Sequence, residues 1–73
     1  MHRLTAYIEK DVESDMYIAI VPSVAGAHTQ AETLDELREN LKEVLELCLE
    51  EMDQESRDVL PEFIGIQQVE VAL

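Results

Sequence analysis

Residues 9–46, EKDVESDMYIAIVPSVAGAHTQAETLDELRENLKEVLE, decide the fold of this chain. An acidic, polar stretch leads into an apolar run that stops at Pro22, which has no backbone N–H to give to a sheet. Gly26 supplies a bend, and Thr33 with Glu36 makes the T-x-x-E capping box that opens a helix. The stretch therefore predicts strands followed by one long helix.

Alternating apolar residues predict the strands around this stretch. Residues 4–9 alternate with the period of a half-buried strand, and Leu4, Ala6 and Ile8 share its apolar face. Residues 16–21 are apolar on both faces, as expected of a central strand. One of these faces carries Met16, Ile18 and Ile20, and the other carries Tyr17, Ala19 and Val21.

Two further strands are predicted, over residues 27–31 and 66–73. In the second, Val69, Val71 and Leu73 alternate with Gln68, Glu70 and Ala72. Residues 54–62 are expected to be a polar connection, after which Phe63 and Ile64 tuck into the edge of the core.

The helix is predicted from the Thr33 cap to residue 53 or 54. At about 100° per residue, its apolar side chains form one stripe about 140° wide, which suits a helix lying on a sheet. The stripe consists of Leu34, Leu37, Leu41, Val44, Leu45, Cys48, Leu49 and Met52, and Leu47 falls outside it. An acidic band beside the stripe includes Glu39, Glu43, Glu46 and Glu50.

These elements predict an α+β fold in the order β-β-β-α-β. A small antiparallel sheet carries one long helix on one face, and residues 1–73 form a single domain. Because one helix covers only one face, Tyr7, Tyr17, Ala19 and Val21 are expected to form an uncovered apolar face that serves oligomerisation or partner docking. The alternative is a polar-edged sheet that tolerates a few exposed aromatic residues.

Charge and size limit the function. The chain has 73 residues, 17 of them acidic and 5 basic, for a net charge of −12. This charge repels phosphate backbones, so we expect no direct nucleic-acid binding and favour a basic partner. The alternative is that the charge only keeps the surface solvated.

A domain this small buries about 60% of its unfolded surface, and the lone Cys48 cannot form an internal disulfide. Self-association into a dimer or tetramer is therefore expected.

No apolar run approaches the ~18 residues of a membrane span, and the N-terminus has no signal-peptide pattern. We therefore expect a cytoplasmic location and no membrane contact.

No residue pattern predicts catalysis, a metal or a cofactor. Asp11, Glu13 and Asp15 resemble the start of a calcium loop, but Met16 and Pro22 stand where that loop needs Gly and Glu. Cys48 lies in the apolar stripe and is expected to be structural. His28 has no carboxylate or nucleophile partner in the sequence, so a surface or partner contact is expected of it.

The spacing of these residues resembles the HicB-type antitoxins of toxin–antitoxin pairs, over about residues 7–49. The matching positions are Glu9, Lys10, Asp11, Tyr17, Ala19, Val21, Pro22, Gly26, Gln30, Thr33, Glu36, Asn40 and Glu43. The chain departs from the pattern at Met16, Ala27 and Ala31, where relatives often have Gly, Cys and Gly.

The resemblance implies a partial RNase-H-like fold without catalysis. It also implies that the protein neutralises a HicA-type toxin, a small basic mRNA-cleaving ribonuclease, by covering the toxin's active surface. The chain ends at the predicted last strand, so DNA binding by a further domain is not expected.

Two alternatives remain open. The chain could instead be an orphan structural or regulatory domain that associates only with itself and has no toxin partner, or a metal-dependent nuclease. For a protein-binding role, the predicted contact residues are Tyr7, Tyr17, Ala19, Val21, His28, Glu39, Glu43, Glu46 and Glu50.

Overall fold

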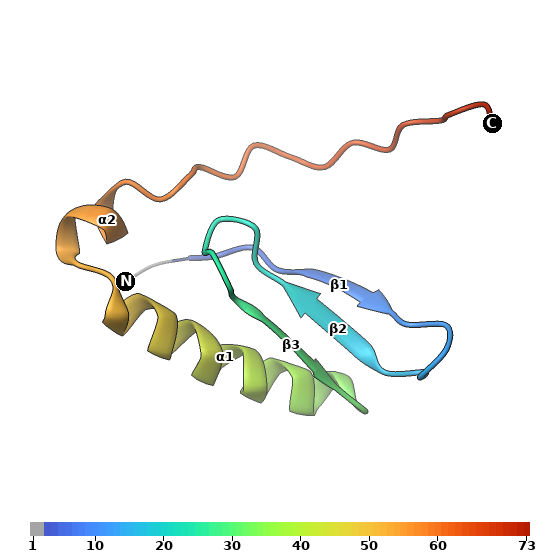
Figure 1. Cartoon of the computed structure of the whole chain (residues 1–73), viewed down its shortest axis with the longest axis horizontal. Helices are drawn as coiled ribbons and strands as arrows, with labels where there is room; N and C mark the ends of the chain where they lie inside the picture. Colours follow the sequence, from blue (N-terminus) through green and yellow to red (C-terminus); the bar gives the residue numbers. More distant parts are fainter. Residues whose placement is uncertain (1–2) are drawn as a thin grey trace.

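A three-stranded antiparallel sheet followed by a long helix forms the body of the protein (Figure 1). The structure is a computed structural model and describes residues 3–73. Strands β1 (Tyr7–Lys10), β2 (Tyr17–Ile20) and β3 (His28–Ala31) lie side by side in sequence order. Helices α1 (Leu34–Glu51) and α2 (Gln54–Asp58) follow. The predicted α+β class, the three strands and the long helix are confirmed.

The central strand β2 pairs with β1 on one side and with β3 on the other. Tyr7 and His28 are both partners of Ile20, and Ile8 and Thr29 are both partners of Ala19. Directly opposed residues share a face of the sheet. Each of these sets of three is therefore a row across the sheet, and the two rows point to opposite faces.

Helix α1 covers the face that carries Ala19. It lies against β3 and β2, where Leu37 packs on the small side chains of Ala19 and Ala31. A second buried cluster consists of Val21, Val24 and Ala27, around the loop between β2 and β3. The core is thus a thin layer between the sheet and one helix.

The expected assignment of the β2 faces is wrong. Tyr17, Ala19 and Val21 were expected on the uncovered face, but Ala19 and Val21 are buried and Tyr17 packs against the Leu37 cluster. Both faces of β2 are apolar, so hydrophobicity alone could not select one. Ala19 and Ala31 determine which face the helix covers, because their small side chains let α1 approach the backbone of the sheet closely.

Local hydrogen bonds define where α1 begins. The Thr33 hydroxyl accepts a hydrogen bond from the backbone N–H of Glu36 at 3.1 Å, as the capping motif predicts. The predicted start of the helix is confirmed, and its end at Glu51 lies two to three residues before the expected one.

The chain after α1 differs from the prediction. Residues 54–58 form the short helix α2 instead of an irregular connection, because Asp53 caps it by accepting from the Ser56 N–H at 2.7 Å. Residues 66–73 form no strand and run as an extended trace past the sheet (Figure 1). Phe63 and Ile64 are 52% and 87% exposed, so the expected burial of these two side chains is also wrong. Alternation identifies an extended segment, but a strand also needs a neighbouring strand to bond.

Candidate partner-binding surfaces

The sheet face opposite α1 is uncovered among the described residues and is partly apolar. Tyr7 and Ile20 are partners across the sheet, and they remain 39% and 43% exposed. His28 follows in the same row and is exposed, and the half-buried Ile18 lies in the next row with Glu9 and Gln30. We call Tyr7, Ile18, Ile20 and His28 the open sheet face. It combines aliphatic area with the side chains of Tyr7 and His28, whose polar tips are able to hydrogen-bond to a partner.

The open sheet face contains only part of the predicted contact set. Tyr7 and His28 lie on it. Ala19 and Val21 are buried beneath α1, so their prediction as surface contacts is wrong, and Tyr17 is half-buried on the same side. Sequence reasoning missed Ile18 and Ile20. The available signal was the polar side of β1: Tyr7 and Glu9 alternate with the apolar Ile8, so the residues opposite them face away from the core.

The acidic band of α1 forms a second exposed surface. Glu39, Glu43, Glu46 and Glu50 are all exposed, as predicted. Within residues 3–73, none of them is paired with a cation; the ion pair found there joins Lys10 to Asp15. Like charges four residues apart on a helix cost about 0.2–0.5 kcal/mol per pair. The band therefore weakens the isolated helix slightly and attracts cations.

The end of α1 adds to this negative potential. Its last turn contains no basic residue, and Glu50 and Glu51 stand there instead. The C-terminal end of a helix already carries partial negative charge from its unpaired carbonyl groups. Charge and dipole therefore have the same sign at this end, which favours contact with a cationic surface.

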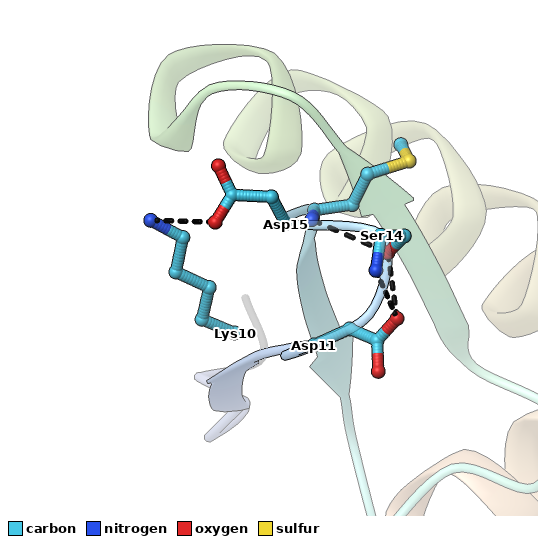
Figure 2. A network of polar contacts seen from close by, with 5 residues as sticks. Lys10, Asp11, Ser14 and Asp15 are labelled. Atoms are coloured by element: carbon cyan, nitrogen blue, oxygen red, sulfur yellow. Dashed lines mark hydrogen bonds and ion pairs between the residues drawn. The ribbon is translucent and has the colours of Figure 1, made fainter.

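The hairpin tip between β1 and β2 is held by its own polar groups (Figure 2). The Asp11 carboxylate accepts hydrogen bonds from the Ser14 hydroxyl at 2.6 Å and from the Ser14 N–H at 3.0 Å, and these bonds lower the pKa of Asp11. Lys10 lies 3.2 Å from Asp15, which raises the pKa of Lys10 through a hydrogen bond and charge attraction. The Asp11 and Asp15 carboxylates of the predicted hairpin tip are therefore engaged in bonds within the hairpin itself.

The Lys10 ammonium also lies 5.4 Å from the centre of the Tyr17 ring, a cation–π distance. This contact and the Asp15 ion pair hold the lysine against the end of the sheet.

A shallow hollow of about 290 Å³ lies where the chain enters β1. Its lining includes Thr5 and Tyr7 on one side and residues 61–65 on the other. The chain that follows α2 therefore passes beside the start of β1 before residues 66–73 extend away.

Residues 3–73 contain neither a cluster of metal-binding side chains nor a membrane-spanning helix. No group of three or more His, Cys, Asp and Glu side chains in this range is placed to hold a metal ion. No helix in the same range is long and apolar enough to cross a bilayer.

Comparison with known proteins gives relatives by sequence. No protein-family model and no solved structure matches the chain. It is 49% identical over 67 residues to a UPF0150 protein of Thermotoga maritima, a match that covers 92% of this chain and 87% of that relative. It is 53% identical over 64 residues to a UPF0150 protein of Archaeoglobus fulgidus and 52% identical over 64 residues to one of Synechocystis; each match covers 88% of this chain and 87% of the relative.

Proposed function

The chain belongs to the UPF0150 family, and from its acidic helix and its resemblance to HicB-type antitoxins we propose that it is a binding protein that neutralises a small, basic, mRNA-cleaving toxin of the HicA type. It acts by covering the toxin's active surface. It carries out no catalysis of its own and uses no cofactor.

The exposed acidic band of α1 is the observation that carries this proposal. A ribonuclease binds the phosphates of its substrate with lysine and arginine side chains. The carboxylates of Glu39, Glu43, Glu46 and Glu50 are exposed on one rigid helix, so they can bind the same cations. RNA and the acidic band then compete for one surface, and competition alone blocks cleavage.

Charge complementarity also supports fast association. A net charge of −12 on a 73-residue protein attracts a basic partner over a Debye length, about 8–10 Å at physiological salt. Rapid capture suits a neutraliser, because a free toxin molecule can cleave RNA until it is bound.

The test is purification of the tagged protein from its native host, followed by a ribonuclease assay. We expect a small basic protein to co-purify and, once separated, to cleave RNA. Adding back the purified chain should stop the cleavage at a fixed molar ratio. Recovery of no basic protein, or of one whose RNA cleavage the chain leaves unchanged, would reject the proposal.

A charge-reversal pair locates the binding surface. Glu43→Lys with Glu46→Lys should weaken inhibition of the toxin by about tenfold or more, because two attractive contacts become repulsive. Glu13→Lys with Glu62→Lys changes the net charge by the same amount at two exposed positions outside α1, so it is the matched control and should retain inhibition.

A further inference from the structure

Besides the outer edge of β3, two backbone surfaces of the chain lack strand partners within residues 3–73. One is the outer edge of β1, which has a single strand neighbour, β2. The other is the extended segment of residues 66–73, which belongs to no sheet. An exposed strand edge and an extended apolar segment each bind another strand readily.

Residues 66–73 have the composition of a strand. Val69 and Val71 are 75% and 72% exposed, and together with Leu73 they alternate with Gln68, Glu70 and Ala72. The segment carries one charged side chain, Glu70, although the chain as a whole is strongly acidic. This segment therefore repels a second copy less than the acidic surface of α1 does.

The edge of β1 is a better acceptor than the edge of β3. All four β1 residues are exposed, including the apolar Tyr7 and Ile8, whereas in β3 Ala31 is buried and Thr29 is half-buried. The segment also starts near β1, because residues 61–65 border the hollow that Thr5 and Tyr7 line. In Figure 1 the C-terminal trace passes β1 without joining it.

The occupant that fits both surfaces is a second copy of this chain. Each copy offers one acceptor edge and one donor segment, so a reciprocal exchange between two copies satisfies both in each. A two-fold arrangement closes after two chains, and neither the outer edge of β1 nor residues 66–73 then remain unpaired. The small core of the isolated domain, with Leu37 and Val21 as its largest fully buried side chains, gains apolar burial from the exchange.

We propose that residues 66–73 of one copy add as a strand to the outer edge of β1 in a second copy, and reciprocally. Each sheet then contains four strands, in the order added strand, β1, β2 and β3. Helix α1 lies against β3 and β2, so its acidic band stays available to a basic partner. The dimer therefore stands independently of the proposed toxin binding.

The first experiment measures the mass of the purified chain by light scattering over a dilution series. The wild-type chain should be a dimer. Val69→Lys with Val71→Lys places charges on the apolar side of the added strand and should raise the dimer dissociation constant by about tenfold or more. Gln68→Lys with Ala72→Lys adds the same charge on the other side and should leave the dimer largely intact.

A chain ending at Gly65 provides a second variant, and circular dichroism establishes that it keeps its sheet and helix. It should be a monomer. A monomeric wild-type chain at micromolar concentration, or a dimer that survives both the paired lysines and the removal of residues 66–73, would overturn the proposal.

Cross-linking distinguishes exchange between copies from folding back within one chain. In a Cys48→Ala background, one chain carries Glu9→Cys on β1 and another carries Glu70→Cys. A short bifunctional thiol reagent should join the two different chains when they are mixed. If it joins the two cysteines only when both are in one chain, at all dilutions, the segment pairs with its own sheet and the proposal is wrong.

Discussion

Tyr7 lies opposite Ile20 across the β1–β2 pair, and both side chains point away from α1. The neighbouring pair, Ile8 and Ala19, points the other way, and Ala19 is buried under Leu37. Adjacent residues of one short strand therefore serve two different purposes. One supports the core, and the other supplies the open sheet face.

Leucine at these two adjacent positions of β2 should lower stability by unequal amounts. Ala19→Leu adds volume where Leu37 already packs, so we expect it to lower the free energy of unfolding by about 1–3 kcal/mol. Ile20→Leu keeps the volume on the open sheet face and should cost less than about 1 kcal/mol. Urea denaturation of the two variants measures the difference. Equal costs would contradict the face assignment.

Gly26 adopts a backbone conformation that other residues rarely adopt. Its φ is +80°, and a Cβ added there would meet nothing within 4 Å. Gly26→Ala should therefore destabilise the fold by about 1–2 kcal/mol through the backbone alone. Gly65→Ala is the control, since Gly65 also has open space around it and lacks a positive φ. Thermal denaturation should show a lower midpoint for the first variant only.

How much the sequence predicted depends on where the deciding interaction lies. The Thr33 cap is a local interaction and was confirmed, and the strand predicted over residues 4–9 was confirmed in part, as β1 at Tyr7–Lys10. The face of β2 depends on which neighbours pair with it, and both of its faces are apolar. Ala19 and Val21 were therefore placed on the wrong side.

The chain after α1 shows the same limit. Residues 66–73 have strand periodicity, but no strand within residues 3–73 pairs with them. Helix α2 was missed because it depends on a single cap by Asp53 in a stretch without apolar periodicity. Of the candidate contact residues, those on the outer side of α1 could be placed from helical periodicity alone, whereas those on the sheet required the register.

The cap of α2 should weaken in acid. Hydrogen bonds from the Ser56 N–H and side chain lower the pKa of Asp53, with a smaller contribution from Arg57. A depressed pKa means that the cap contributes fully at neutral pH. The contribution is lost as the pH falls below the ordinary aspartate value of about 4 and through the lowered pKa.

The Ser56 amide proton reports this titration by nuclear magnetic resonance. Its chemical shift should move with a midpoint below that of an ordinary aspartate. Asp53→Asn should remove the transition at this amide, because the amide side chain does not titrate. A midpoint at or above the ordinary value would show that the bond does not favour the carboxylate.

The acidic band of α1 should impose a small stability cost. Glu39, Glu43 and Glu46 are exposed and lie three or four residues apart on one helix face. Glu43→Lys converts the repulsive pair with Glu39 into an attractive one, in the favourable order with the glutamate first. It also makes the pair with Glu46 attractive, in the less favourable order with the lysine first. We expect the free energy of unfolding to rise by about 0.5–1 kcal/mol at low salt and the gain to shrink as salt screens it.

The same substitution should weaken binding to a basic partner, so stability and affinity should change in opposite directions. Glu13→Lys at the hairpin tip is the control: it alters the net charge equally and lies outside α1. Denaturation at two salt concentrations, with a binding titration of each variant, separates these effects. If Glu43→Lys stabilises the fold and leaves partner binding unchanged, the band only solvates the surface, and the partner binds elsewhere, with the open sheet face as the next surface to test.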